Sequence, residues 1–235
     1  MNSIIKSALA LATTAAFVQA AEFTGKVTLK GTPPPAKPIP AVKADPNCGK
    51  THSEEVFTRT FVVAADGGLG NVVVYIKGGL EGKTFPVPAE KPLIDQVGCM
   101  YEPYVSAVMA GQTFQVRNSD AFMHNVNATP KNNKGFNVAQ ATAGQIKEVV
   151  YDKPELGAKF ACNVHPWMFA YLTVVDNPFF AVTDKDGKFV IKGDLPDGKY
   201  TVEAFHQKAG AVTAEVTVKG GKAMADFAIE LKAAQ

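Results

Sequence analysis

The sequence predicts an all-β protein, with a larger β-sandwich followed by a small antiparallel β-sandwich module. Apolar and polar residues alternate over short segments, as they do in half-buried strands. Turns that draw on 20 glycines and 15 prolines separate these segments. After the first 20 residues, no stretch has a sustained apolar period of 3.6 residues. Short strands joined by turns are typical of sandwiches and barrels.

Residues 1–20 are predicted to be a secretory signal peptide. Lys6 supplies a positive charge, and an apolar region continues to Val18. The small residue at Ala20 fits the cleavage rule, so we expect cleavage before Ala21. The apolar region is too short to span a bilayer, and no other stretch is long enough. We therefore expect a periplasmic or secreted protein that has no membrane attachment after cleavage.

The larger domain is predicted to occupy residues 21–176, as a copper-binding domain with an N-terminal β and proline-rich extension. Thr32–Pro46 contains six prolines and is expected to lie on the surface, because proline cannot donate to a central sheet. The predicted strands of this domain are Phe23–Lys30, Thr58–Ala65, Asn71–Lys77, Leu93–Tyr101, Tyr104–Met109, Thr113–Arg117, Gln145–Tyr151, Lys159–Cys162 and Phe169–Val175.

A second domain is predicted at residues 177–235, after the boundary signal Asp176-Asn-Pro178. Its strands are expected at Phe179–Thr183, Lys188–Lys192, Lys199–Phe205, Val212–Lys219 and Ala223–Leu231. About 59 residues make a small independent domain, so we expect this module to pack on the larger one.

The segment Phe160–Phe169 contains the densest set of potential metal ligands. Cys162, His165 and Met168 follow the spacing Cys-x2-His-x2-Met. A thiolate, an imidazole and a thioether on one loop suit copper that alternates between Cu(I) and Cu(II). A mononuclear site of this kind needs a second histidine, and His124 is the candidate.

Two segments resemble the blue-copper proteins, or cupredoxins, of the plastocyanin and pseudoazurin type. The matching residues of the first segment are Phe114, Val116, Asn118, Phe122, His124 and Asn125. Cys162, His165 and Met168 match the second segment, and the resemblance covers roughly Leu93–Val175. It implies a Greek-key sandwich with one type 1 copper per chain. His124, Cys162 and His165 would bind the metal in a plane, Met168 would be the axial ligand, and the Asn125 N–H would bond the Cys162 sulfur.

The ligand loop departs from the plastocyanin type in one respect. That type leaves four residues between histidine and methionine, and this loop leaves two. The shorter spacing resembles the copper loop of cytochrome oxidase subunit II, whose binuclear site needs two cysteines in the loop. This loop has one, so we predict a mononuclear site. Met123 remains an alternative to Met168 as the axial ligand.

The three cysteines divide into a pair and one remaining thiol. Cys162 lies in the ligand motif, so Cys48 and Cys99 are the expected disulfide, and an exported protein permits it. Closing a loop of about fifty residues would stabilise the fold by roughly 3–4 kcal/mol in the chain-entropy model.

The C-terminal segment resembles the carboxypeptidase regulatory-like, or transthyretin-like, β modules. The matching residues are Asp186, Gly187, Gly193, Leu195, Pro196, Gly198, Tyr200 and Val202. Such modules are accessories without catalytic residues, so the resemblance implies an interaction or stabilising role.

These observations predict an electron carrier that is not an enzyme and that exchanges single electrons with donor and acceptor proteins. The ring edge of His165 is the expected electron port, with apolar neighbours such as Trp167 and Phe122 forming a docking patch. A net charge of +2 without a basic cluster does not indicate nucleic acid. A nitrite reductase or multicopper oxidase needs more histidine than the four present, so a copper enzyme of that kind would require an oligomer that assembles a site between subunits. The remaining alternative is a metal-free or copper-binding secreted module for protein interaction or carbohydrate binding.

Overall fold

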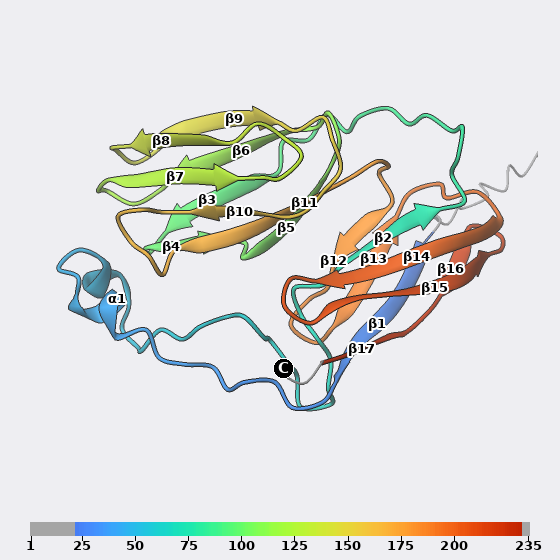
Figure 1. The fold of residues 1–235 in the computed structure, drawn as a ribbon, viewed down its shortest axis with the longest axis horizontal. Coiled ribbons are helices and arrows are strands. Elements are labelled where there is room, and N and C mark those ends of the chain that lie inside the picture. Colours follow the sequence, from blue (N-terminus) through green and yellow to red (C-terminus); the bar gives the residue numbers. More distant parts are fainter. Residues whose placement is uncertain (1–21, 232–235) are drawn as a thin grey trace, which may run out of the picture.

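The structure is a computed structural model that describes residues 22–231. The predicted signal peptide, residues 1–20, and the cleavage point before Ala21 lie outside these residues. The chain forms two β-sandwiches side by side, and a long excursion of the chain runs past both (Figure 1). Within residues 22–231, no helix is long and apolar enough to cross a membrane.

The middle sandwich lies within residues 93–175 and has two sheets. One sheet has the strand order β5-β11-β10-β7-β8, and the other has the order β4-β3-β6-β9. The strand bounds are β3 Leu93–Val97, β4 Met100–Glu102, β5 Val105–Met109, β6 Thr113–Asn118, β7 His124–Thr129, β8 Phe136–Gln140, β9 Ile146–Val150, β10 Glu155–Ala161 and β11 Phe169–Val175. This is the cupredoxin-like sandwich that the resemblance implies.

The terminal sandwich combines strands from both ends of the described chain. One sheet has the order β12-β2-β14-β15; in the other, β1 lies between β13 and β16 and also pairs with β17. The strand bounds are β1 Glu22–Lys30, β2 Val73–Gly78, β12 Phe180–Val182, β13 Lys188–Lys192, β14 Gly198–His206, β15 Gly210–Val218, β16 Lys222–Met224 and β17 Phe227–Glu230. The all-β fold class predicted from the sequence is therefore confirmed.

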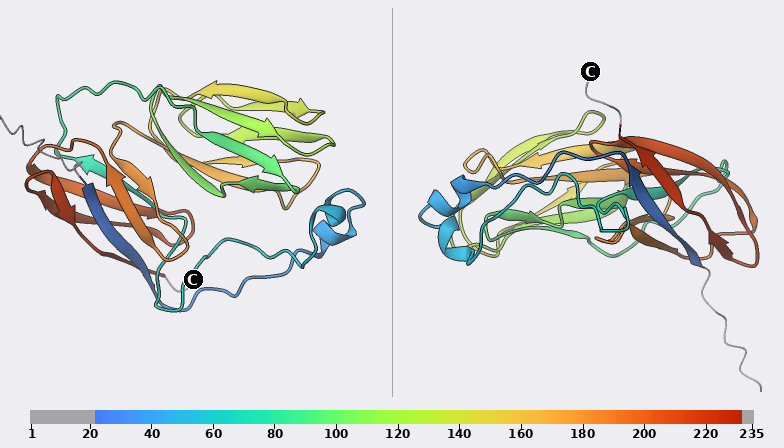
Figure 2. Two further views of the ribbon diagram at one scale, coloured as in Figure 1. Left: turned by 180° about the vertical axis from the view of Figure 1, so that it is seen from behind. Right: turned by 90° about the horizontal axis from the view of Figure 1, so that it is seen from below.

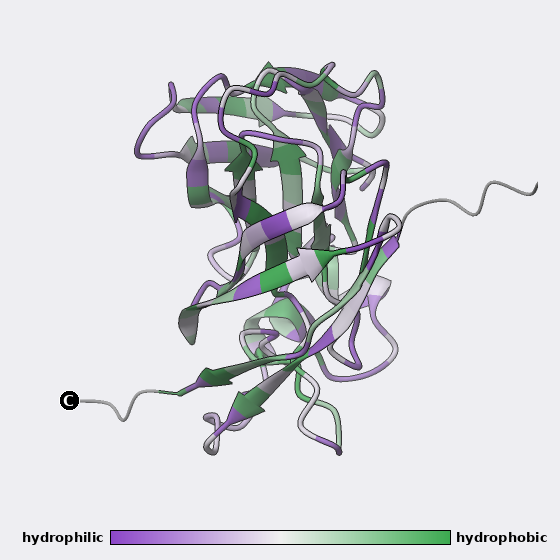
Figure 3. Ribbon diagram, turned by 90° about the vertical axis from the view of Figure 1, so that its right-hand side faces the viewer, coloured by the Kyte–Doolittle hydropathy of each residue, from purple (hydrophilic) through white to green (hydrophobic). Residues whose placement is uncertain are grey.

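Burial patterns explain why these segments form strands. In β6, every second residue is buried, as expected for a strand with one face on a core. The same alternation occurs in β13. β11 is buried along almost its whole length, because it lies between β5 and β10 and is covered on both faces. Figure 3 shows the hydrophobic residues concentrated on the strands and the hydrophilic residues in the connecting loops.

The strand pairing divides the chain differently from the expected boundary between residues 176 and 177. β1 pairs in parallel with β17 and antiparallel with β13, and β2 pairs with β12 and β14. The first two strands thus complete the C-terminal module, although the sequence analysis placed them in the copper domain. The core explains this arrangement, because Phe23, Val27 and Val74 are buried in one cluster with C-terminal residues such as Phe189 and Ile229.

Residues 31–60 form the excursion, which we call the strap. It leaves the end of β1, reaches the far end of the middle sandwich and returns (Figure 2). Its turning point contains a short helix, α1 (Pro40–Ala44), and a 3-10 turn, η1 (Cys48–Thr51). The Cys48–Cys99 disulfide joins this turning point to the middle sandwich, as predicted. The predicted strand Thr58–Ala65 is not formed, because its backbone pairs only at isolated bridges.

Three clusters of buried side chains hold the molecule together. One fills the terminal sandwich and one fills the middle sandwich. A third, smaller cluster joins the two, with Val73 of β2 packed among Tyr104, Val105 and Tyr171 of the middle sandwich. The two sandwiches therefore share an apolar contact, as expected from the small size of the C-terminal module.

Candidate metal centre

The structure brings three of the four predicted ligands, His124, Cys162 and His165, together at the strap end of the middle sandwich, and Met168 lies in the same buried cluster as Cys162. His124 is the first residue of β7, and Cys162 directly follows β10. His165 and Met168 lie in the loop before β11. All four side chains are buried, with exposed fractions of 0% for His124, 2% for Cys162, 5% for His165 and 0% for Met168.

The three strongest donors of this set converge. The Nδ1 atoms of His124 and His165 are 3.0 Å apart, and His165 Nδ1 is 3.7 Å from Cys162 Sγ. One ligand atom from each of the three residues lies within 4.8 Å of the other two. The backbone N–H of Asn125 donates to Cys162 Sγ at 3.4 Å, as the resemblance implies.

The ligand loop is fixed by its own backbone. The Cys162 N–H donates to the Met168 carbonyl at 3.0 Å, and the Met168 N–H donates to the His165 carbonyl at 2.9 Å. These two bonds close the shortened loop and point Met168 into the core cluster that also contains Cys162. Met123, the alternative axial ligand, is 48% exposed. The burial therefore favours Met168.

A polar network fixes the orientation of His124. Its Nε2 lies 2.8 Å from a carboxylate oxygen of Asp120, which leaves Nδ1 facing His165 and Cys162. Asp120 also accepts the backbone N–H groups of Gly98 and Cys99, at 2.7 and 2.8 Å. The side chain of Asn118 donates to the Phe122 carbonyl and shapes the loop that leads to His124. The motif residue Asn118 therefore has a structural role behind the ligands.

The electrostatics of the site favour a thiolate at Cys162. Burial by itself raises the pKa of this thiol, but hydrogen bonds from His124 and from nearby backbone N–H groups bring the pKa below its ordinary value. Burial lowers the pKa of His124, yet hydrogen bonds with Asp120 and Cys162 leave it raised overall. Burial and the neighbouring His124 lower the pKa of His165. The lowered pKa values of Cys162 and His165 favour a deprotonated cysteine and a neutral imidazole, which are the forms that bind metal.

The donor set fits a metal ion of the copper type. Bonds of about 2.0–2.3 Å to nitrogen and sulfur keep neighbouring donor atoms about 3–4 Å apart, and the observed separations of 3.0 and 3.7 Å agree with this. One thiolate, two imidazoles and a buried thioether match the composition of blue-copper sites. His124, Cys162 and His165 would hold the ion, and Met168 is the fourth candidate ligand.

The ring of His165 is covered by neighbouring residues and is only 5% exposed. The sequence analysis expected the edge of this ring to be the electron port. The strap carries Asp45 to within 3.9 Å of His165 Nε2. Asp45 is fixed there by accepting the backbone N–H groups of Asn47 and Cys48, each at 2.9 Å. The Trp167 ring lies 5.3 Å from the His165 ring and donates its indole N–H to the Cys99 carbonyl. The strap and its disulfide, which the sequence analysis treated as a surface extension, thus close this side of the site.

Sequence reasoning missed two side chains of the site. Asp120 lies four residues before His124, and a carboxylate so close to a ligand histidine is a signal that could have identified it. Asp45 gives no comparable signal, because only the fold of the strap brings it to His165. His52 is partly buried, and its Nε2 lies 2.6 Å from the Gly98 carbonyl.

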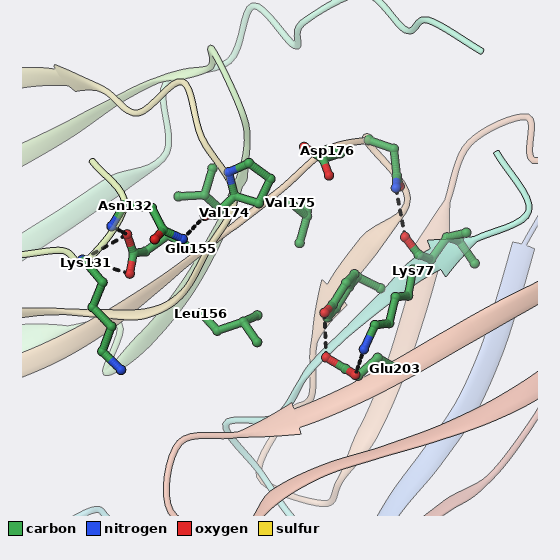
Figure 4. Close-up of a pocket in the computed structure, with 13 residues that line it drawn as sticks. Lys77, Lys131, Asn132, Glu155, Leu156, Val174, Val175, Asp176 and Glu203 are labelled. Carbon is green, nitrogen blue, oxygen red and sulfur yellow. Dashed lines mark hydrogen bonds and ion pairs between the residues drawn. The ribbon is translucent and has the colours of Figure 1, made fainter. Parts of the chain in front are cut away.

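A separate pocket of about 480 Å³ lies between the two sandwiches (Figure 4). Its two buried carboxylates already have partners. Glu155 accepts the backbone N–H groups of Lys131 and Asn132, and Glu203 binds Lys77 and the Tyr75 hydroxyl. These contacts make the pocket a polar part of the junction between the sandwiches, and none of the four candidate ligands lines it.

No protein-family model and no curated protein matches this chain. Among solved structures, it is similar to the Cu-containing nitrite reductase (NirK) from Thermus scotoductus SA-01, at 20% identity and a TM-score of 0.35. This match covers 41% of the chain and 24% of the reductase. The purple cupredoxin from Nitrosopumilus maritimus matches at 24% identity and a TM-score of 0.31, over 36% of this chain and 99% of that one. A point mutant of amicyanin in its Cu(I) form matches at 17% identity and a TM-score of 0.32, over 43% of this chain and 97% of that one.

Proposed function

We propose that this chain is an exported type 1 copper protein that carries single electrons between a donor and an acceptor protein. One copper per chain would be held by His124, Cys162 and His165, with Met168 as the axial ligand. The observation that supports this most strongly is the position of His165 Nδ1, which lies 3.0 Å from Nδ1 of His124 and 3.7 Å from Sγ of Cys162.

The bound copper would supply a one-electron couple between Cu(I) and Cu(II). The residues around it favour rapid exchange, because they restrict movement of the ligands. Asp120 fixes the ring of His124, and two backbone bonds fix the loop from Cys162 to Met168. Ligands that keep one geometry in both oxidation states reduce the rearrangement that accompanies electron transfer. Burial of all four side chains also keeps water away from the centre.

The N–H of Asn125 has a further role in this proposal. It donates to Cys162 Sγ at 3.4 Å, and a hydrogen bond to sulfur stabilises the thiolate relative to a protonated thiol. Hydrogen bonding around the cysteine sulfur also tunes the potential of such sites. Asn125 itself is anchored, because its side-chain oxygen accepts the backbone N–H of Asn163.

We assign no catalytic role to the chain. A copper enzyme of the nitrite reductase kind needs further histidine-rich centres, and the other two histidines already have structural partners. His52 is bound to the Gly98 carbonyl, and His206 accepts the backbone N–H groups of Lys208 and Ala209. Neither lies in a group of potential metal ligands among residues 22–231.

The absorption spectrum of the copper-loaded, oxidised protein tests the proposal. We expect an intense thiolate-to-copper charge-transfer band in the orange-red that disappears on reduction. Cys162→Ser should abolish the band, because a hydroxyl is too hard a donor to replace the thiolate. Met123→Leu is the matched control and should leave the band unchanged, since that side chain is largely exposed. A colourless oxidised protein, or a band that survives in Cys162→Ser, would contradict the proposal.

A further inference from the structure

The Cys48–Cys99 disulfide lies directly against the candidate metal centre. The two disulfide sulfurs and a nitrogen of His165 lie within 4.8 Å of one another. A second group with the same limit contains the Cys99 sulfur, an oxygen of Asp120 and a nitrogen of His124. His165 therefore belongs both to the candidate copper site and to a set of donors that includes both disulfide sulfurs.

Cys99 is also connected to both ligand segments by hydrogen bonds. Its N–H donates to the carboxylate of Asp120, and the same carboxylate oxygen lies 2.8 Å from Nε2 of His124. Its carbonyl accepts the indole N–H of Trp167, from the loop that carries His165. With Gly98, Cys99 forms the two-residue turn between β3 and β4, and both residues have positive φ. The disulfide thus joins the strap to a turn that contacts both the segment of His124 and the loop of His165.

With the disulfide formed, the centre has no open approach from the strap side. Cys48 and Cys99 have exposed fractions of 0%, and Val42 of α1 is equally buried. All three belong to the core cluster that contains Cys162 and Met168. Since the ligand side chains are at most 5% exposed, a copper ion can enter from this side only if the strap moves. The covalent link between Cys48 and Cys99 opposes that movement.

As free thiols, the same two residues have a different chemistry. The strap is then held only by non-covalent contacts, and two soft sulfur donors lie beside one imidazole. Thiolates select Cu(I) over harder ions. We propose that Cys48 and Cys99, before they are joined, form with His165 an uptake site for Cu(I). The ion passes from there to Cys162 and His124 through the shared His165, and disulfide formation then closes the strap over the loaded centre.

The proposal consists of a transfer of Cu(I) followed by oxidation of two thiols, and the oxidant is another protein's disulfide. Copper remains Cu(I) throughout the transfer, and Cys162 releases its proton when it binds the ion. Cys48 and Cys99 release their thiol protons to solvent when they bind Cu(I) as thiolates. After the ion has passed on, the two thiolates lose two electrons as their S–S bond forms, and the disulfide that accepts the electrons takes up two protons from solvent. An exported protein disulfide accepts these electrons by thiol–disulfide exchange and becomes a dithiol. The inference rests on the proposed copper centre for the destination of the ion, but the uptake site can be tested without that centre.

The first experiment removes the destination. In a Cys162→Ser background, the apo protein is prepared as the disulfide and, with a phosphine reductant, as the dithiol. Each form competes anaerobically for Cu(I) with a chromophoric Cu(I) chelator. We expect the dithiol to hold one Cu(I) per chain at least about 100-fold more tightly than the disulfide form. Adding Cys48→Ser and Cys99→Ser should remove this difference, with circular dichroism confirming that each variant is folded.

Equal Cu(I) retention by the two forms, or strong retention after both serine substitutions, would overturn the uptake site. The second experiment uses apo protein with Cys162 present and follows growth of the charge-transfer band after Cu(I) loading and oxidation. The disulfide form should load at least about tenfold more slowly than the dithiol form, and similar rates would overturn the closing role. If neither form develops a band while the first experiment succeeds, the proposed function fails and the uptake site stands.

Discussion

The two sandwiches share a strand architecture but bury different chemistry. The middle sandwich encloses a polar group at its strap end, which consists of Gln96, Asn118, Asp120, His124, Gln140 and His165. Its members are bonded to one another. Gln96 donates to Gln140, and Nε2 of His124 lies 2.8 Å from a carboxylate oxygen of Asp120. The terminal sandwich has a largely apolar core, with Tyr200, Ile191 and Ile229 among its most buried side chains. Because buried polar groups cost free energy unless they are paired, these hydrogen bonds let the fold keep polar side chains buried beside the candidate metal centre.

Both sandwiches nevertheless contribute to closing the metal centre. The strap begins at the end of β1 in the terminal sandwich, and its turning point is fixed to the middle sandwich by the disulfide. Arg59, near the return end of the strap, donates to the Tyr101 carbonyl at 2.8 Å. The terminal sandwich thus anchors the start of the strap, and the middle sandwich contains the candidate metal centre that the strap covers. The following experiments test this division of roles.

The largest expected effect comes from matched core truncations. Phe114 in the middle sandwich and Phe189 in the terminal sandwich are both almost fully buried, with exposed fractions of 0% and 3%. Phe114→Ala and Phe189→Ala should each lower the free energy of unfolding by about 4 kcal/mol, as is usual for buried phenylalanine. Thermal unfolding should be followed both by circular dichroism and by the charge-transfer band.

Loss of colour is the readout that separates the two variants. Phe189→Ala should leave the band of the folded protein unaltered, because Phe189 packs against Phe23 and Phe227, away from the ligands. Phe114→Ala should release copper at a lower temperature. If both variants lose colour and secondary structure together at the same temperature, the sandwiches unfold as one unit and the comparison fails.

Removal of the disulfide should act on the strap. The bond closes a sequence separation of 51 residues, so Cys48→Ala with Cys99→Ala should lower the free energy of unfolding by about 3 kcal/mol. Once copper is loaded, the charge-transfer band should persist, since His124, Cys162, His165 and Met168 are unchanged. Denaturant titration of oxidised wild type against the double variant measures the difference. Chemical reduction of wild type is the matched control and should reproduce the loss.

A buried histidine gives the terminal sandwich its own pH dependence. Burial lowers the pKa of His206 from 6.5 to about 4, and its ring stacks on Phe61. The folded state therefore keeps His206 neutral where the unfolded chain already binds a proton. Stability should fall by no more than about 3 kcal/mol as pH decreases from about 6.5 to about 4, and then level off. His206→Gln should remove this part of the pH dependence, and an unchanged profile in the variant would refute the assignment.

The smallest expected effect separates the two methionines. Met168→Leu should keep the blue colour, because Cys162 and two histidines still hold the copper. Its potential should rise, since loss of a weak donor destabilises Cu(II) more than Cu(I). Met123→Leu should leave the potential nearly unchanged, as Met123 is 48% exposed. Voltammetry on both variants measures the reduction potential. A shift of the potential in Met123→Leu alone would assign the axial position to Met123 in place of Met168.

Short-range sequence patterns predicted the bounds of individual strands, because those bounds depend on neighbouring residues. The alternation in Lys188–Lys192 gives the bounds of β13, and the run Phe169–Val175 gives those of β11. The Cys-x2-His-x2-Met spacing identified side chains that the fold brings together with His124. By contrast, β7 and β8 were not predicted. The inward positions of β7 include His124, so a polar ligand interrupts the apolar alternation that marks a strand.

The sequence did not show which strands pair with one another when they are far apart along the chain. Alternation in Phe23–Lys30 shows that one face of this strand is buried, but it does not show which strand lies beside it. β1 pairs with β13, β16 and β17, although the middle sandwich is much nearer in sequence. The position of Asp45 over His165 depends on the same topology, which is why no motif revealed it.

The pairing of β1 also has a consequence for how the chain is made. Thr28 donates to the Phe227 carbonyl across a separation of 199 residues, and Val27 lies opposite Phe227 in the sheet. A ribosome completes the whole middle sandwich before it has made any of the three strands that flank β1. Throughout that interval β1 is an unpaired edge, which is the kind of strand that associates with other chains. Correct assembly therefore depends on keeping β1 free of wrong partners until the last strands of the terminal sandwich have been synthesised.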